Sequence, residues 1–257
     1  MNRWASKLIV HLALGCAFIG LNAQHSRAAV VTFDGSSGSL SAEAVFSLSG
    51  STLTVTLTNT GTADVMAPGD VLVAVLFNTS TAAGHGLTAV SASLNGSSVF
   101  YSSIVNNVGE GWQYKSPLSP PAHGENSGIS ASGLGGTFDS GGPFFYSPGQ
   151  PPLNGVNYGI LSAGDDTATG NGGITGGGPL IKDSLQFTLT AGANFSLDDL
   201  GDTVVFQYGT MLTEPSFPSR PHTPSAAPEP MSLLVWSTLL GTFGVSYAFW
   251  RNRQRAV

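Results

Sequence analysis

Apolar and polar residues alternate along the first part of the chain, which is the pattern of half-buried β-strands. In residues 51–59 (STLTVTLTN), three apolar side chains fall on one face and threonines fall on the other. A similar segment, 42–49, precedes it, and the Ser-Gly pair between the two predicts a hairpin turn. The alternation returns at 184–190 and 203–209, so both ends of this region predict strands.

Other segments predict strands of different kinds. Residues 71–77 (VLVAVLF) form a continuous apolar run, which predicts a strand covered on both faces. Segments 87–94 and 97–102 are separated by Asn95-Gly96, a dipeptide that favours a two-residue hairpin turn. We find no helical stripe longer than two turns before residue 214. The pattern therefore predicts an all-β, β-sandwich-like domain over residues 29–213.

Glycine is concentrated in the middle of this domain. Between residues 124 and 178, 17 of 55 residues are glycine. Glycine at this density favours loops over packed strands, so we expect long loops closing over one end of the sandwich. Short strands are expected near 144–147 and 157–162.

Charge and cysteine content restrict the classes of function. Residues 29–230 contain three basic residues against all fifteen acidic ones, a net charge of −12. Such a domain repels phosphate backbones, so nucleic acid is excluded as a partner. The single cysteine, Cys16, lies in an apolar run at 8–21 that follows two basic residues. With small residues before Ala29, this predicts a signal peptide over 1–28, removed by signal peptidase, and a mature chain without thiols.

The C-terminal region has three consecutive parts. Residues 214–230 carry a proline at every third position from 215 to 224, which predicts a polyproline II spacer of roughly 50 Å. Residues 231–250 contain no charge, and a helix of this length is about 30 Å long, enough to cross a bilayer as a transmembrane helix. A basic tail, 251–257, follows and is expected to stay cytoplasmic. Its basic cluster consists of Arg251, Arg253 and Arg255.

In this order, the tripeptide Pro228-Glu229-Pro230, the apolar span and the arginines resemble the PEP-CTERM sorting signal of exported bacterial proteins. The resemblance covers residues 227–257. It implies that Pro228, Glu229 and Pro230 are recognised by an exosortase, a membrane-embedded cysteine transpeptidase that cuts near the motif. The inner membrane would then hold the protein only transiently, before the domain reaches the cell surface or the extracellular matrix. The alternative is an ordinary single-span anchor.

Two groups of residues are candidates for ligand binding. Acidic clusters offer oxygen ligands for calcium, although neither has an EF-hand spacing, so binding would be weak and solvated turns are the alternative. These clusters are Asp165 and Asp166, and Asp198, Asp199 and Asp202. Trp112 and Tyr114 lie two apart and would share one face of a strand, either as a platform for sugar stacking or as part of the core.

A resemblance to serine proteases is limited to short segments. Residues 139–143 (DSGGP) resemble the loop around their nucleophile, which here would be Ser140, and 81–85 (TAAGH) resembles the loop that carries their histidine. His85 precedes Ser140 by only 55 residues, too few for the strands and the acid that such a fold places between them. We therefore expect no enzyme.

The sequence predicts an exported surface or matrix protein with a structural or adhesive, non-enzymatic role and no required cofactor. The alternative is a carbohydrate-binding module that acts on exopolysaccharide.

Overall fold

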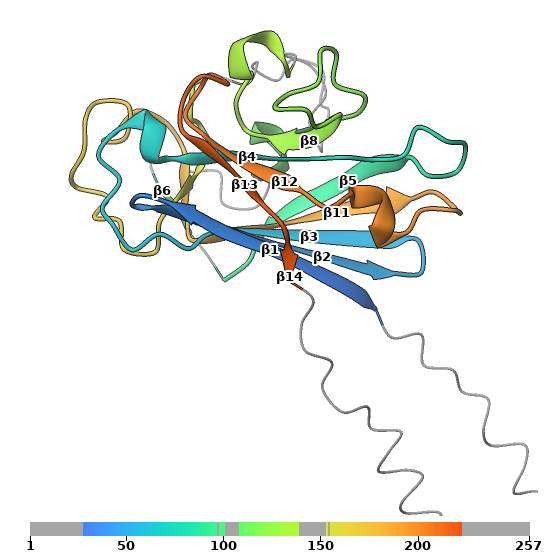
Figure 1. The fold of residues 1–257 in the computed structure, drawn as a ribbon. Coiled ribbons are helices and arrows are strands. Elements are labelled where there is room, and N and C mark those ends of the chain that lie inside the picture. The colour runs from blue at the N-terminus through green and yellow to red at the C-terminus, as the bar shows by residue number, and fades with distance from the viewer. Residues whose placement is uncertain (1–27, 97, 101–107, 139–152, 154, 223–257) are drawn as a thin grey trace, which may run out of the picture.

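The structure, a computed structural model, describes residues 28–96, 98–100, 108–138, 153 and 155–222. This part of the chain is all-β, as predicted, and consists of two sheets that face each other around a common core (Figure 1). No helix in it is long and apolar enough to cross a membrane, and the predicted transmembrane segment lies outside the described residues.

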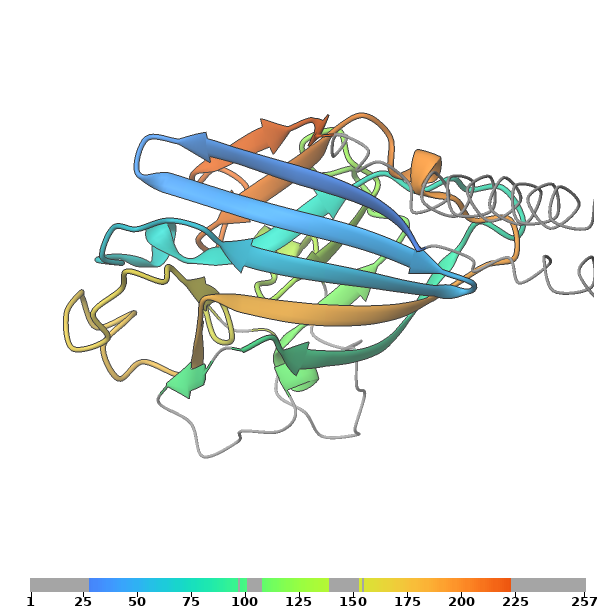
Figure 2. The same ribbon diagram turned by 90° about the horizontal axis from the view of Figure 1, so that it is seen from below.

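The first sheet has six strands in the order β14-β1-β2-β3-β11-β5, and all neighbours are antiparallel. Figure 2 shows β1, β2, β3, β11 and β5 side by side. The bounds are β1 Ala29–Ser37, β2 Leu40–Ser49, β3 Thr52–Asn59, β5 Leu87–Leu94, β11 Ser184–Ala191 and β14 Pro221–His222.

The second sheet follows the order β13-β12-β4-β9-β10-β6, and β8, which carries β7, pairs with β4. Its bounds are β4 Leu72–Phe77, β6 Ser98–Phe100, β7 Gln113–Lys115, β8 Ser127–Ser130, β9 Ile160–Leu161, β10 Leu180–Lys182, β12 Val204–Tyr208 and β13 Ser216–Ser219. Within the described ranges, short 3-10 helices connect the strands: η1 Pro68–Asp70, η2 Val108–Gly111, η3 Leu134–Gly136 and η4 Leu197–Leu200.

The strand predictions from hydrophobic patterning are confirmed. Segments 42–49 and 51–59 form the β2–β3 hairpin, with buried and partly exposed residues alternating along both strands. All six residues of β4 are buried, as the continuous apolar run predicted. In the glycine-rich region, the strand expected within 157–162 is present as β9, while 144–147 lies outside the described residues.

The hairpin predicted at Asn95-Gly96 is wrong. β5 pairs with β11 in the first sheet, whereas β6 pairs with β10 in the second, so the chain changes sheets at Gly96, where φ is +68°. The β10–β11 junction changes sheets beside it. The two crossings are joined where Asn95 Nδ2 donates to Ser184 Oγ (3.2 Å) and Ser184 Oγ donates to the Asn95 carbonyl (3.0 Å). The Asn-Gly dipeptide marks a turn, but β5 and β6 pair with other strands, β11 and β10, and this pairing decides where the chain goes after the turn.

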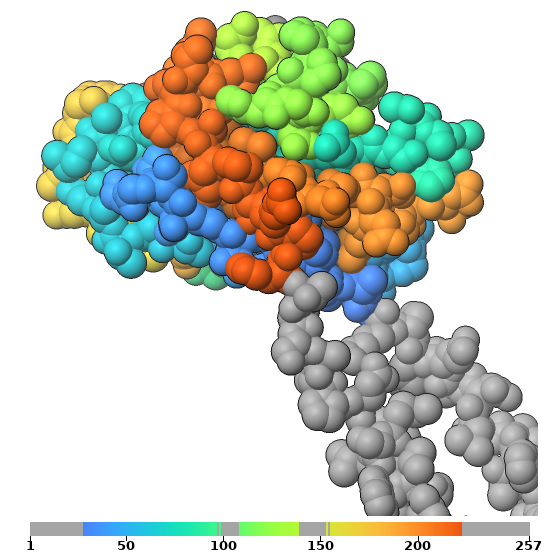
Figure 3. Space-filling model, viewed as in Figure 1, coloured from blue at the N-terminus to red at the C-terminus, as the bar shows by residue number. Residues whose placement is uncertain are grey.

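The predicted spacer also begins too early, because residues 214–222 belong to the domain. β13 pairs with β12 and β14 pairs with β1, so the chain passes from the second sheet back to the first. Figure 3 shows this segment along the seam between the blue β1 region and the green 108–138 region. Pro218 is tolerated because β13 is an edge strand, and the buried Phe217 anchors the segment to the core. Only residues 223–230 remain as a connection to the predicted span.

Aromatic side chains join the two sheets across the core. Phe46 of β2 makes edge-to-face contacts with Phe33 of β1 and with Phe77 of β4, at ring-centroid distances of 5.7 Å and 5.4 Å. Trp112, which is fully buried, packs against Phe187 of β11 at 4.9 Å. Such pairs add to the hydrophobic gain of burying large rings.

Trp112→Ala should therefore lower the free energy of unfolding by about 3–5 kcal/mol, because it removes a buried indole and leaves a cavity. Chemical denaturation followed by circular dichroism measures this change. Val90→Ala, at a position with 43% exposure, is the control and should stay within about 0.5 kcal/mol of wild type. Equal, small effects of both substitutions would contradict the placement of Trp112 in the core.

Candidate functional site

A pocket of about 220 Å³ lies at the end of the sandwich where β3 ends and β4 begins. β1 runs from Ala29 toward this pocket, which Ser39 and Leu40 line at the start of β2, so we call this end of the sandwich the pocket end. The lining residues are Ser39, Leu40, Asn59, Gly61, Ala63, Asp64, Val65, Met66, Asp70 and Ser162.

Most polar groups of the pocket already hold its walls together. The buried Asn59 donates from Nδ2 to the Ile160 carbonyl (2.9 Å) and accepts from the Gly61 N–H (3.1 Å). Ser162 Oγ donates to the Ala63 carbonyl at 2.6 Å. These bonds connect the loop after β3 to the segment after β9, so the fold itself holds the walls of the pocket in place.

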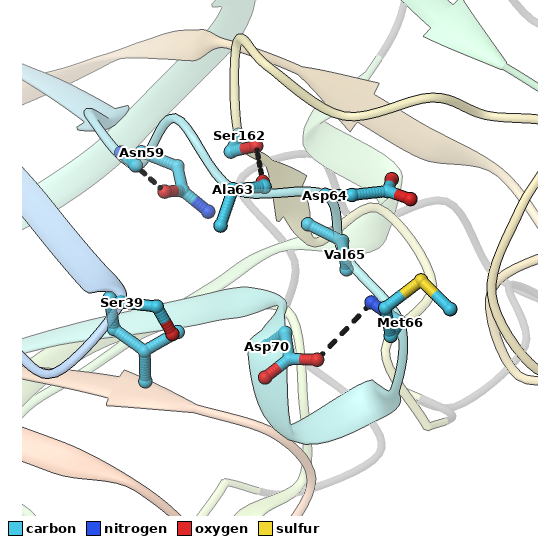
Figure 4. Close-up of a pocket in the computed structure, with 10 residues that line it drawn as sticks. Ser39, Asn59, Ala63, Asp64, Val65, Met66, Asp70 and Ser162 are labelled. Atoms are coloured by element: carbon cyan, nitrogen blue, oxygen red, sulfur yellow. Dashed lines mark hydrogen bonds between the residues drawn. The ribbon is translucent and has the colours of Figure 1, made fainter.

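Two polar groups remain available to a ligand. Asp70 accepts the N–H groups of Met66 and Ala67 through Oδ2 (3.2 Å and 3.0 Å), which leaves Oδ1 without a bond to the described residues. The same is true of the Ser39 hydroxyl. Figure 4 shows Ser39 and Asp70 around the pocket, with Asp64 directed away from Ser39 and Asn59. None of the described residues that line the pocket is basic, so it suits a small cation or a neutral polyol and disfavours anions.

Behind the pocket, two aspartates connect the loop after β3 to the loop after β9 through hydrogen bonds. Asp165 Oδ1 accepts the Val65 N–H at 2.9 Å, and in return Asp64 Oδ1 accepts the Asp166 N–H at 2.9 Å. Asp64 Oδ2 also accepts the hydroxyl of Thr169 at 2.5 Å. We call this arrangement the aspartate clasp.

The two carboxyl groups of the clasp have opposite electrostatic environments. Hydrogen bonds from Thr169 and from the Asp166 backbone lower the pKa of Asp64. Burial raises the pKa of Asp165, and the neighbouring Asp64 adds to this rise, while the Val65 N–H and the Lys182 charge oppose it. The sequence drew attention to Asp165 and Asp166, but it missed Asp64, which lies about one hundred residues earlier.

The carboxyl groups of the second acidic cluster, at Asp198, Asp199 and Asp202, do not form a common site. Asp198 and Asp202 are exposed, whereas Asp199 Oδ2 accepts the Ser196 N–H (2.9 Å) and lies 2.8 Å from His85 Nδ1. Hydrogen bonds from Ser196 and His85, together with the His85 charge, outweigh desolvation and lower the pKa of Asp199. This pair fastens the loop before β5 to η4. Among the residues that the structure places, no group of three or more His, Cys, Asp or Glu residues is arranged to hold a metal.

The predicted sugar platform is not present. Trp112 is 0% exposed, and its Nε1 donates to the Tyr158 carbonyl at 3.1 Å. Tyr114 is half-buried and stacks on Phe77 with ring centroids 6.4 Å apart. Both side chains are therefore part of the core, which was the alternative to a sugar-stacking platform.

Several predicted residues fall outside the part of the chain that the structure describes. Ser140 of the protease-like loop is one of them, while His85 is described and pairs with Asp199. The sorting motif and the basic cluster also lie outside it, as Pro228, Glu229, Pro230, Arg251, Arg253 and Arg255.

The chain matches no protein-family model, no curated protein and no solved structure at a significant level.

Calcium should have only a modest effect on the domain, because the described acids offer no three-ligand group. We expect millimolar calcium to shift the melting temperature by only about 1–2 °C, because a ligand present near its dissociation constant stabilises the folded state only slightly. Scanning fluorimetry with calcium, magnesium and EDTA measures this shift. A rise of many degrees at micromolar calcium would show a dedicated site and overturn this expectation.

Proposed function

We propose that this chain is an exported bacterial surface or matrix protein with a structural or adhesive, non-enzymatic role, sorted through a PEP-CTERM signal. The observation that carries the proposal is the ordered set of the proline-rich tripeptide, the uncharged span and the terminal arginines at 228–257. The leader over 1–28 adds the export step, with signal peptidase as the processing enzyme.

The domain boundaries agree with this processing scheme. β1 begins at Ala29, directly after the predicted leader, and β14 ends at His222, just before the motif. Thr32 and His222 are register partners, so both connections leave from one edge of the first sheet. The eight residues from 223 to 230 span at most about 29 Å. The domain would thus be held close to the inner membrane, with its pocket end facing away.

We expect Pro228-Glu229-Pro230 to be the processing signal and the span at 231–250 to be a temporary anchor. Replacing Glu229, or both prolines, by alanine keeps the span equally apolar, so membrane insertion should persist while release is lost. Immunoblots of membrane and extracellular fractions, with and without the host exosortase, measure release. The wild-type domain should appear outside, shortened by about thirty residues. If wild type and variant both stay full-length in the membrane, the segment is a plain anchor.

A second candidate, polysaccharide binding, is favoured by the outer face of the first sheet. The pairing registers place Ser47, Thr54, Thr188 and Ser91 in one row across four strands. A second row consists of Ser49, Thr52, Thr190 and Thr88. We call these two rows, with the adjacent Thr56, Thr58 and Ser93, the hydroxyl face.

The hydroxyl face is nearly free of charge in a strongly acidic domain. Glu43 is the only charged residue in β2, β3, β5 and β11. Strands lie about 4.8 Å apart and residues two apart along a strand about 6.7 Å, so hydroxyls recur at regular intervals. Each hydroxyl both donates and accepts hydrogen bonds, as sugar hydroxyls do. A neutral polysaccharide meets no charge repulsion on this face.

We expect Thr54→Glu with Ser91→Glu to abolish any binding to cellulose or curdlan, because the charges disrupt a hydroxyl row. Ser119→Glu adds charge at an exposed position away from this face and is the matched control. Sedimentation with each insoluble glycan measures binding, and melting curves confirm that the variants fold. If the double variant binds a glycan as well as wild type does, the hydroxyl face is excluded as the binding surface. If wild type binds neither glycan, the structural role is favoured.

A further inference from the structure

The aspartate clasp contains a buried oxygen atom that has no partner. Asp165 is 4% exposed, and its Oδ2 receives no hydrogen bond from the residues that the structure describes. Its Oδ1 already accepts the Val65 N–H. An ionised oxygen without a donor is costly to bury, so this carboxyl group needs a compensating partner.

One candidate for this partner is another carboxyl group, that of Asp64. The crossed bonds of the clasp hold the carboxyl groups of Asp64 and Asp165 beside each other, since each accepts the backbone N–H of the residue that follows the other. Each carboxyl group also acts on the pKa of the other through a side-chain hydrogen bond. Two ionised carboxylates have only acceptors, so this bond exists only when one of them carries a proton. Two neighbouring carboxyl groups favour such a singly protonated state, because ionising both places like charges side by side.

The other charged groups determine which carboxyl group is protonated. Lys182 of β10 is the cation that acts on Asp165, but its Nζ donates to the Asp165 carbonyl (2.7 Å) instead of to Oδ2. Asp64 accepts two hydrogen bonds that favour its ionised form, from the Asp166 N–H and the Thr169 hydroxyl. Asp166 itself is exposed and accepts the Ala168 N–H. Asp165 therefore carries the proton, and ionised Asp64 accepts the hydrogen bond from it.

We propose that Asp165 and Asp64 share one proton, and that this proton closes the contact between the loops at 60–67 and 162–170. Asp64 and Ser162 line the pocket, so the clasp supports the pocket wall. When the proton is lost, two carboxylates face each other behind that wall and the loops loosen. The clasp is thus a pH-sensitive lock at the pocket end.

The direction of the pH effect follows from the two aspartates. The raised pKa of Asp165 means that its contribution to stability is complete below the unfolded pKa and is lost as pH rises through the folded value. The lowered pKa of Asp64 means that its contribution is present above the unfolded pKa and is lost as pH falls through the folded value. The lock is therefore strongest at mildly acidic pH, between the two folded values.

The two corresponding amide variants should behave in opposite ways. Asp165→Asn can still accept the Val65 N–H and can donate to Asp64 permanently, so it imitates the protonated form. Asp64→Asn has one carbonyl oxygen in place of two acceptors, and it loses a bond to either Asp166 or Thr169. Independent surface acids would give no such asymmetry, because removing either charge would have a similar small effect.

Hydrogen exchange measured by mass spectrometry on the full chain in detergent tests the proposal, with protection factors for residues 60–67 and 162–170. At pH 4.5 the protection factors of Asp165→Asn should match those of wild type. At pH 7.5 they should be higher, by about tenfold for each unit by which folding raises the pKa of Asp165. Asp64→Asn should be less protected at both pH values. Asp166→Asn removes an exposed charge one residue away and is the control, with no pH-dependent difference from wild type.

Two results would overturn the proposal. Equal protection of wild type and Asp165→Asn at both pH values would show that no proton is shared. Lower protection of Asp165→Asn at pH 7.5, together with protection of wild type by added calcium chloride, would show that the pair holds a cation in place of a proton. Neither result bears on sorting or export, because the measurement requires no membrane partner.

Discussion

The contact of Phe46 with Phe33 and Phe77 is the interaction on which the rest of the structure depends. It connects β1 and β2 of one sheet to β4 of the other, and it lies in a core to which all long strands contribute. No disulfide is available, since the only cysteine is Cys16. Burial of apolar surface between the sheets therefore supplies most of the stabilisation.

Strand edges are the second constraint on a two-sheet domain, because unpaired edges invite association with other chains. Here the chain itself passes between the sheets at both sides, through β5–β6 and β10–β11 at one side and through β13–β14 at the other. Pro218 places a residue without an N–H on an edge strand, and a register shift in the β5–β11 pair interrupts the other edge. These features reduce the unpaired backbone that the two sheet edges offer to other chains.

The sequence was most informative where structure follows from local patterning. Alternation predicted β2, β3, β11 and β12, and a continuous apolar run predicted β4, because burial of each face appears directly in the residues. The crossing at Gly96 could not be predicted, since the turn signal is local and the choice of partner strand is not. Phe217 was the one large apolar residue within the proline-rich segment at 214–230, and its importance depends on the core that receives it.

The candidate site was only partly predictable for a similar reason. The sequence named Asp165 as a candidate calcium ligand, but its partner Asp64 follows a different strand, and no spacing rule connects the two. The sequence left Trp112 open to two interpretations, an exposed platform and a core residue, and its burial and packing against Phe187 decide for the core. Sequence reasoning therefore finds residue types suited to a site, while convergence of distant loops decides whether the site exists.

The pairing of β14 with β1 has a consequence for how the protein matures. The first strand of the domain finds one of its neighbours only in the last two residues of the domain, so folding cannot finish until residue 222 is free to pair with it. Until then, the outer edge of β1 and the site that receives Phe217 remain uncovered in the emerging chain. If the protein is sorted as proposed, only a few residues then separate the completed sheet from the sorting motif. Completion of the fold and exposure of that motif would then be nearly simultaneous, which makes the order of synthesis a form of quality control.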